Sequence, residues 1–271
     1  MTPLPRIALA AVLWFALGAE APAPAPVPAK LSMWRLDCGT LNYDEARTLP
    51  ANRTRMPLPC FLIRHGDSYM LWDTGLSARA LGVKTERYQL DRLIVDQLKE
   101  IGVRPDQIAV IGISHYHGDH TGQASHFPKA KLIIAAKELA ALAATPTPQG
   151  AAPTHLQPWI SGGAPLQAAV EDVDVFGDGR VLAFHTPGHT PGHMSLMVKL
   201  AGRTVLLTGD LWGSWEGVLT DDMPDWSASR AETHASRERF RRMAMKEDAM
   251  VIVQHDEGDR LKLPPFPQAA E

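Results

Sequence analysis

The chain has few cysteines and no surplus of basic charge, and each shortage excludes a class of protein. Its 271 residues include 2 Cys, too few for a disulfide scaffold or a cysteine-rich zinc site. Lys and Arg total 27 against 30 Asp and Glu, whereas proteins that follow a phosphate backbone usually carry a basic surplus. We therefore expect no nucleic-acid partner. With 45% hydrophobic and 21% charged residues, the chain is typical of one globular domain with its own core.

The sequence also lacks an apolar run long enough to cross a bilayer. The N-terminal run Ile7–Leu17 has 11 residues, whereas a spanning helix needs about 20. Arg6 precedes it and small residues follow it, so residues 1–21 are predicted to be a signal peptide cleaved at its end. The alternatives are an uncleaved anchor or a start assigned too early. In residues 22–30 Pro alternates with Ala or Val, which predicts an extended linker.

An exported chain is expected in the periplasm or outside the cell, without stable membrane association after cleavage. A disulfide between Cys38 and Cys60 is compatible with such an oxidising compartment. The alternative is two small buried thiols on neighbouring strands. We favour the thiols, because the sequence alone does not fix the separation of the two Cα atoms.

Short apolar runs bounded by turn residues predict strands along most of the chain. They are Met33–Leu36, Cys60–Ile63, Tyr69–Trp72, Ile108–Ile113, Leu132–Ala135, Val181–Phe184, Met194–Val198, Thr204–Leu207 and Met250–Val253. Apolar positions from Leu90 to Ile101 follow one face of a helix that Gly102 would end. Because helices are interspersed among the strands, the fold class is α/β or α+β with sheets covered by helices.

A second helix is predicted to open with a capping box of Ser229 and Glu232. Its inner side is expected to carry Ala231, Ala235, Phe240 and Met243. Its arginines are expected to form a solvated face: Arg230, Arg237, Arg239, Arg241 and Arg242. Between the two helices, Thr145–Pro165 is rich in Pro, Gly, Ala and Thr, with Leu156, Trp159 and Ile160 as apolar anchors. A long segment of this kind is expected to be a loop that covers or lines a site.

The motif that carries most information is His115-x-His117-x-Asp119-His120, directly after the predicted strand Ile108–Ile113. A loop leaving a strand can turn alternate side chains one way, so His115 and His117 are expected to hold one cation. Asp119 and His120 would then face a second cation. Imidazole together with carboxylate suits zinc, or iron and manganese, rather than calcium. The alternative is a surface histidine cluster without a ligand.

Two cations need more donors than one loop supplies, and three further candidates follow predicted strands. His189 lies in a Pro/Gly turn between two strands, Asp210 ends the segment Leu206–Asp210, and His255 follows the run Val251–Val253. A rigid sheet can hold functional side chains in the loops at its strand ends. We therefore predict that these three side chains complete the site.

With these motifs in this order, the sequence resembles the metallo-β-lactamase superfamily of hydrolases from about Leu31 to Pro267, which leaves residues 268–271 as a tail. The resemblance implies a single domain with a four-layer αββα sandwich and two divalent metal ions, zinc or alternatively iron, manganese or cobalt. The implied ligands are His115, His117 and His189 for one ion, Asp119, His120 and His255 for the other, and Asp210 bridging both. Asp73 matches an acidic residue that supports the metal loop, and His193, which matches no ligand, is expected to play a supporting role.

Within the superfamily the sequence is most similar to N-acyl-homoserine lactonases, through Trp34–Gly39, Pro59–Ile63, Asp73–Gly75 and Gln254–Asp256. The resemblance implies that a hydroxide formed at the two ions opens a lactone ring, with Asp119 and Asp210 as the catalytic carboxylates and Asp119 as the proton acceptor. The expected substrate is a small molecule with an apolar tail. The residues that would line its pocket, or else pack in the core, are Trp212, Trp215, Met223 and Trp226. The tyrosine that these lactonases carry shortly after the bridging aspartate is absent here.

Four alternatives stand beside the lactonase. A β-lactamase would suit the periplasm, but such enzymes generally lack the bridging aspartate present as Asp210. A thioesterase of the glyoxalase II type would need a basic cluster near the C-terminus, which the chain lacks. A redox module like the flavodiiron proteins has a carboxylate where this chain has His117, and a non-catalytic member of the fold usually loses ligands. Nothing in the sequence indicates an oligomeric state.

Overall fold

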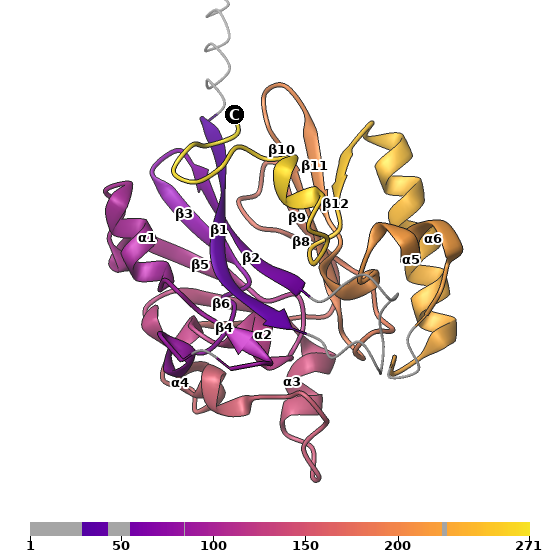
Figure 1. The fold of residues 1–271 in the computed structure, drawn as a ribbon, viewed down its shortest axis with the longest axis horizontal. Helices are drawn as coiled ribbons and strands as arrows, with labels where there is room; N and C mark the ends of the chain where they lie inside the picture. The colour runs from indigo at the N-terminus through magenta and orange to yellow at the C-terminus, as the bar shows by residue number, and fades with distance from the viewer. Residues whose placement is uncertain (1–28, 43–54, 84, 224–226) are drawn as a thin grey trace, which may run out of the picture.

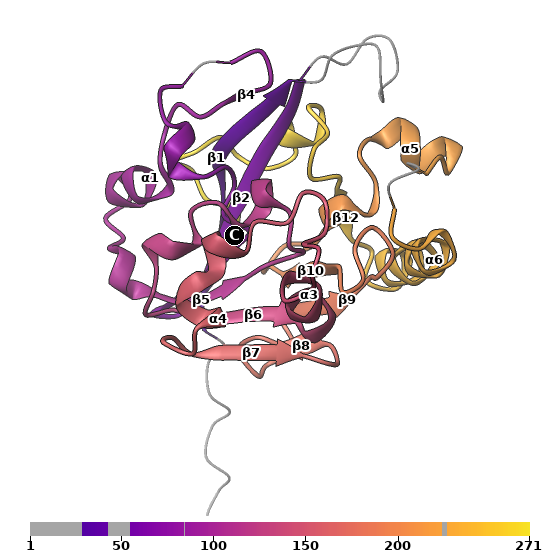
Figure 2. The same ribbon diagram turned by 90° about the horizontal axis from the view of Figure 1, so that it is seen from below.

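The computed structural model describes residues 29–42, 55–83, 85–223 and 227–271. In these residues two sheets pack face to face with helices on both outer sides, so the layers run α, β, β, α (Figures 1 and 2). This confirms the predicted fold class. The predicted signal peptide, most of the linker and Trp226 lie outside the described residues. Within them, no helix has both the length and the apolar character needed to cross a membrane.

The first sheet has seven strands in the described part of the chain. In spatial order they are β4 (Tyr88–Gln89), β1 (Leu31–Asn42), β2 (Arg55–His65), β3 (Ser68–Trp72), β5 (Ile108–Gly112), β6 (Lys131–Ala135) and β7 (Leu166–Ala169). Strands β3, β5, β6 and β7 run parallel, and parallel neighbours end at the same edge of a sheet. Asp73 and Ser114, which follow β3 and β5, therefore lie side by side.

The second sheet has five strands within the described residues. In spatial order they are β12 (Met250–Ile252), β11 (Thr204–Leu207), β10 (Met194–Lys199), β9 (Val181–His185) and β8 (Val173–Asp174). Strands β11 and β12 are parallel, so the segments that carry Asp210 and His255 leave the sheet at one edge. The turn between β9 and β10, which carries His189, lies at the same edge because β10 is antiparallel to both of its neighbours.

All nine predicted strands are confirmed, with ends displaced by a few residues. Three strands had no sequence signal: β4, β7 and β8. Each has only two to four residues, and side chains that are largely exposed or half-buried. Such short strands exist because a neighbouring strand offers backbone hydrogen bonds, and an apolar pattern in their own sequence is not required.

Helices cover the outer face of each sheet (Figure 2). The α-helices are α1 (Ile94–Glu100), α2 (Gly118–Thr121), α3 (Ala136–Leu142), α4 (Gln157–Ile160), α5 (Trp215–Thr220) and α6 (Arg230–Lys246). The 3₁₀ turns are η1 (Ala78–Ala80), η2 (Pro105–Gln107), η3 (Ala124–His126), η4 (Pro153–Leu156), η5 (Gly209–Leu211) and η6 (Asp259–Leu261). Both predicted helices are present, but the first begins only at Ile94, so Leu90 and Leu93 of its predicted face precede it. Gly102 follows α1 at φ +72°, and the Ser229 side chain accepts the Glu232 backbone N–H at the start of α6.

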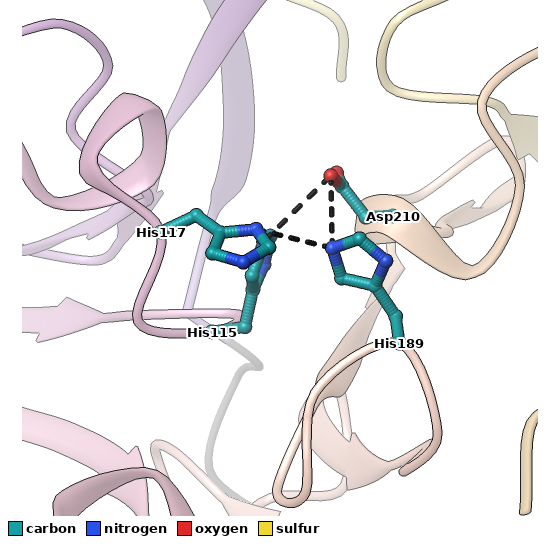
Figure 3. A group of neighbouring side chains, drawn as sticks. All are labelled: His115, His117, His189 and Asp210. Atoms are coloured by element: carbon teal, nitrogen blue, oxygen red, sulfur yellow. Dashed lines mark hydrogen bonds and ion pairs between the residues drawn. The ribbon is translucent and has the colours of Figure 1, made fainter. Parts of the chain in front are cut away.

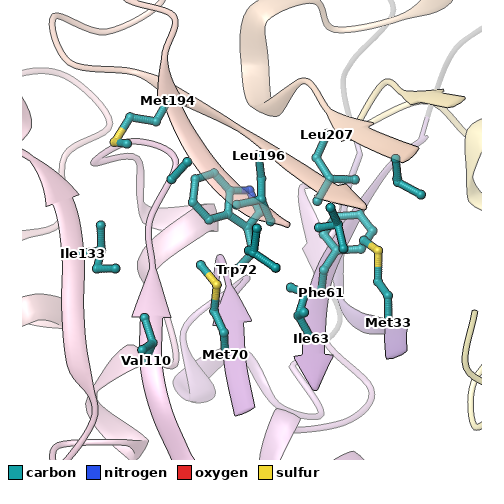
Figure 4. Packing of buried hydrophobic residues seen from close by; sticks show 14 of the residues in the cluster. Met33, Phe61, Ile63, Met70, Trp72, Val110, Ile133, Met194, Leu196 and Leu207 are labelled. Carbon is teal, nitrogen blue, oxygen red and sulfur yellow. The ribbon is translucent and has the colours of Figure 1, made fainter. Parts of the chain in front are cut away.

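The main core lies between the two sheets (Figure 4). Phe61, Met70 and Trp72 from the first sheet face Leu196 and Leu207 from the second, and all five are fully buried. Burying a side chain of this size contributes about 1.5–3 kcal/mol. This core holds the two sheets at a fixed spacing, and the loops at their shared edge are held with them.

The inner face of α6 differs from the prediction. Ala231 and Ala235 are exposed, while Phe240 is buried as expected. Arg237 is only 1% exposed and donates hydrogen bonds to the backbone carbonyls of Leu211, Asp221 and Asp222. The prediction of a solvated arginine face is therefore wrong for Arg237. Its guanidinium faces a loop whose carbonyl groups have no strand partner, and a buried donor with several N–H groups satisfies them.

The preference for two thiols is also wrong, because Cys38 and Cys60 form a disulfide with Cα atoms 5.8 Å apart. The two residues lie on the antiparallel strands β1 and β2, where Leu36 is paired with Cys60 and a register shift follows Asp37. This pairing could not be read from the spacing along the chain.

Two further segments are more ordered than expected. Part of Thr145–Pro165 folds as η4 and α4, with Leu156 and Trp159 buried in the core, although Ile160 is 41% exposed. The segment lies against the metal-ligand motif, where Ala151 pairs with His117. At the C-terminus, Ala270 exchanges two backbone hydrogen bonds with Met33 on β1, so the residues expected as a tail join the first sheet.

Candidate metal centre

The loop after β5 carries four of the predicted ligands. Strand β5 is apolar and almost wholly buried, and the chain leaves it through Ser114 into the motif. His117 precedes α2 in extended conformation, so Asp119 and His120 lie on the first turn of that helix. This change from extended chain to helix separates the two histidines before it from the two residues after it.

Four side chains from three loops form the first group: His115, His117, His189 and Asp210 (Figure 3). His115 Nε2 lies 2.9 Å from His117 Nδ1, which lies 3.2 Å from His189 Nε2. An oxygen of Asp210, Oδ2, lies 3.4 Å from His189 Nε2 and 3.7 Å from His115 Nε2. Ligands on a tetrahedral zinc ion with bonds of about 2.0–2.1 Å are separated by about 3.4 Å. The spacing of these donors fits one such cation.

The second group consists of Asp119, His120 and His255. The other oxygen of Asp210, Oδ1, reaches this group, 2.8 Å from His255 Nε2 and 3.2 Å from His120 Nε2. Among the described residues, the buried Nε2 of His120 has no hydrogen bond of good geometry. This nitrogen faces the carboxylates of Asp119 and Asp210, which are the surroundings expected of a metal ligand. Asp210 therefore lies between the two groups with one oxygen toward each.

Asp73 orients the loop that carries His115 to His120 by accepting hydrogen bonds from it. It is 1% exposed, accepts the Nδ1–H of His120 at 2.8 Å, and accepts both the N–H and the hydroxyl of Ser114 at 2.8 and 2.9 Å. The Gln254 amide donates to the same carboxylate at 2.8 Å. The Ser114 hydroxyl in turn accepts from His115 Nδ1 at 3.0 Å. Fixing each Nδ1 in this way leaves Nε2 of both histidines directed at the centre.

His193 is buried beside the two groups, but both of its ring nitrogens are already engaged. Nδ1 lies within hydrogen-bond distance of the Thr186 hydroxyl and carbonyl, and Nε2 accepts the backbone N–H of Asp210 at 2.9 Å. Burial lowers the pKa of His193 to about 4, so the ring is neutral and Nε2 can accept. The contact places the backbone of Asp210 where its carboxylate reaches both groups.

The electrostatics of the cluster favour neutral imidazoles in the first group and an ionised aspartate. Burial lowers the pKa of His189 to about 3 and also lowers the pKa values of His115 and His117. Burial opposes ionisation of Asp210, but the neighbouring His255 and His120 hold its pKa well below the usual value. Deprotonated imidazole and ionised carboxylate are the forms that bind metal.

In the second group, Asp210 raises the pKa values of His120 and His255 against the opposing effect of burial. Asp210 therefore favours the protonated form of both rings, and a metal ion would compete with protons for their nitrogens.

Of the described residues predicted to line a substrate pocket or else pack in the core, Trp212 and Trp215 belong to one apolar cluster. Trp212 is 2% exposed and packs between Phe240 and the guanidinium of Arg237 in a cluster under α6. The Trp215 indole N–H donates to Asp259, and Met223 is 5% exposed. Trp212 therefore has little free surface for a substrate.

Sequence reasoning did not find the buried Glu138 on α3, whose carboxylate contacts two of the ligand loops. A single Glu in a helix gives no signal of such a role. Five other histidines of the described residues lie in neither group: His65, His126, His155, His185 and His234.

An αββα sandwich with clustered imidazoles and carboxylates at the shared edge of its two sheets defines a class of metal-binding proteins. The chain belongs to the metallo-β-lactamase superfamily, whose family profile matches residues 53–255.

Similar proteins narrow the class. The chain is 31% identical over 231 residues to the N-acyl homoserine lactonase AttM of Agrobacterium fabrum, covering 74% of this chain and 82% of the relative. It is 28% identical over 233 residues to the N-acyl homoserine lactonase AiiA of Bacillus thuringiensis subsp. kurstaki, covering 81% and 89%. Its fold is similar to an N-acyl homoserine lactone hydrolase solved with the product N-hexanoyl-L-homoserine at the catalytic metal centre. That comparison has a TM-score of 0.76 and 22% identity, and covers 90% of this chain and all of the other.

Proposed function

We propose that this protein is a binuclear metal-dependent hydrolase that opens the lactone ring of N-acyl homoserine lactones. The observation that carries the proposal is the pair of donor groups that share Asp210. His115, His117 and His189 would hold one ion, and the second group, Asp119, His120 and His255, the other. The similarity to AttM and AiiA supports the choice of substrate.

The donor set fits two zinc ions, because imidazole and carboxylate are ligands that zinc accepts and the spacing matches its bond lengths. When bound, the ions supply an activated water and polarise the lactone carbonyl. The chain's own residues prepare the site for that chemistry. Asp210, ionised and 15% exposed at its side chain, holds the two groups together.

We propose that Asp119 moves the proton. Its side chain is 20% exposed, and Oδ2 lies 3.7 Å from His120 Nε2, so the carboxylate borders both the centre and solvent. A carboxylate in that place can accept a proton from the attacking water and pass it to the alkoxide leaving group of the opened ring.

The test is a substrate panel with a matched histidine control. We expect purified protein to contain close to two zinc ions per chain and to prefer N-hexanoyl and N-decanoyl homoserine lactones over a cephalosporin and a glutathione thioester. His189→Gln should abolish turnover and reduce the metal content, whereas His234→Gln, a substitution outside both groups, should change neither. A metal content near zero in the wild type after growth with zinc would contradict the metal centre. Preference for the cephalosporin or the thioester would contradict the substrate.

We further propose that the protein is exported. The disulfide between Cys38 and Cys60 supports this, because disulfides persist in the periplasm and outside the cell. The full-length chain expressed in bacteria should appear in the periplasmic fraction or the medium with Pro22 as its first residue. Recovery of only the uncleaved chain from the cytoplasm would contradict the proposal.

A further inference from the structure

Glu138 is a buried carboxylate outside both donor groups, and it contacts two of the loops that carry them. It lies on the first turn of α3, is 0% exposed, and uses a different oxygen for each loop. Its Oε2 accepts the backbone N–H of Tyr116 at 2.7 Å, and its Oε1 accepts the backbone N–H of Gly192 at 2.6 Å.

Both contacts fall close to predicted metal ligands. Tyr116 lies between His115 and His117, and Gly192 lies in the turn between β9 and β10 that carries His189. The two loops come from different sheets, so the distance between them depends on links of this kind. The described residues contain a second direct link, the hydrogen bond from Met194 N–H to the Ser114 carbonyl at 2.9 Å.

The turn lies so close to α3 that only glycine fits at position 192. A Cβ atom there would lie 2.8 Å from the Ala135 Cβ and 2.9 Å from the Glu138 backbone nitrogen. The start of α3 and the turn are therefore in direct contact, and the Glu138 side chain spans from this contact to the loop after β5.

Burial raises the pKa of Glu138 to about 7, and the Thr190 side chain together with the backbone N–H groups of Gly192 and Tyr116 opposes that rise. Placing a carboxyl group here has a desolvation cost that an apolar side chain would not have. A carboxylate has two acceptor oxygens at a fixed separation, which an apolar side chain cannot replace.

We propose that Glu138 is a positioning residue that sets the separation of His115 and His117 from His189 by holding one loop with each of its oxygens. The proposal rests on the metal centre of the proposed function. It concerns how the first donor group is assembled, and it assigns Glu138 no contact with substrate or metal.

The test compares Glu138→Gln and Glu138→Asp with Leu142→Ala. Glutamine keeps the length but has one acceptor oxygen, so its amide NH₂ must face one of the two backbone N–H groups. Aspartate keeps the carboxyl group with both oxygens but is too short to reach both loops. Leu142 is buried on the same helix, so its truncation destabilises α3 without removing either hydrogen bond.

We expect both Glu138 variants to bind zinc about 10–100-fold more weakly in a chelator competition, since partners that orient ligands have effects of this size. The visible spectrum of the cobalt-substituted protein should change, and kcat should fall with KM nearly unchanged. Leu142→Ala should lower the melting temperature but keep the wild-type zinc affinity and cobalt spectrum.

Wild-type zinc affinity in Glu138→Gln, or its restoration in Glu138→Asp, would overturn the proposal. So would a loss of affinity in Leu142→Ala equal to that of Glu138→Gln at equal loss of melting temperature. Because zinc affinity is measured without substrate, failure of the wild type to turn over lactones would contradict the proposed function and leave this test intact.

Discussion

Replacing Asp73 with Asn isolates the role of the carboxylate behind the metal-ligand loop. Asp73 has a positive φ of 57°, a conformation that Asn tolerates well, so the substitution keeps the backbone and changes only the side chain. Oδ2 accepts from Ser114 Oγ, His120 Nδ1 and Gln254 Nε2, and Oδ1 accepts from the Ser114 N–H.

The expected loss of unfolding free energy follows from the number of hydrogen-bond donors that the Asn side chain would leave without an acceptor. In its better orientation Asn keeps its one oxygen toward the three donors and turns its NH₂ toward the Ser114 N–H. Two buried donors then face each other, and each unsatisfied group costs about 1–3 kcal/mol. We expect the free energy of unfolding of the metal-free protein to fall by about 3 kcal/mol, and the zinc affinity to fall about 10–100-fold because His120 loses a charged partner.

The assay is urea unfolding in EDTA together with zinc titration, with Asp248→Asn as the control. Asp248 also has a positive φ, 45°, but it is exposed, so its substitution tests the backbone conformation alone. The control should unfold and bind zinc like the wild type. An Asp73→Asn variant within about 0.5 kcal/mol of the wild type, with unchanged zinc affinity, would refute the reasoning, because surface substitutions alone produce changes of that size.

Asp210→Ala should reduce lactone turnover by at least about a hundredfold and lower the metal content, because the carboxylate contacts both donor groups; near wild-type activity would contradict its bridging place. For the metal-free protein, burial keeps His115, His189 and His193 neutral, with pKa values of about 3 for His189 and about 4 for His193. For these three groups the unfolded chain binds more protons than the folded one, whereas the raised pKa of Glu138, about 7, has the opposite effect as pH drops from about 7 to 4.5. The shifts of His189 and His193 together exceed that of Glu138, so stability should still fall as pH drops from about 6.5 toward 3–4, with a contribution of about 3 kcal/mol from His193 alone. Urea unfolding in EDTA at a series of pH values checks this, and stability that rises on acidification through that window would be inconsistent with it. The double variant Cys38→Ser/Cys60→Ser should unfold with about 3 kcal/mol less free energy, from the chain entropy of a loop with a sequence separation of 22; equal stability of the two proteins would show that the disulfide contributes nothing.

The sequence predicts the long strands and helices correctly, because their apolar and capping patterns depend only on residues close in sequence. A buried parallel strand such as β5 must be apolar along its length, and the start of α6 satisfies its own N–H groups with Ser229. The prediction that Arg237 of α6 is solvated is wrong, because this part of the helix faces a loop whose backbone carbonyl groups accept hydrogen bonds from Arg237. No periodicity in the helix reports what lies opposite it.

For the site, too, some features could be predicted from the sequence and others depend on the tertiary structure. The sequence by itself determined the motif from His115 to His120, and the positions of His189, Asp210 and His255 after strands indicated that they belong with it. The tertiary structure decided that Asp210 lies between two donor groups, that Asp73 and His193 orient their neighbours, and that Glu138 joins two loops. It also decided that Cys38 meets Cys60. The reason is physical: strand and helix patterns depend on neighbours a few residues away. These contacts depend on how strands pair within a sheet and on how the two sheets pack, which brings together residues as distant in sequence as Gln254 and Asp73, 181 positions apart.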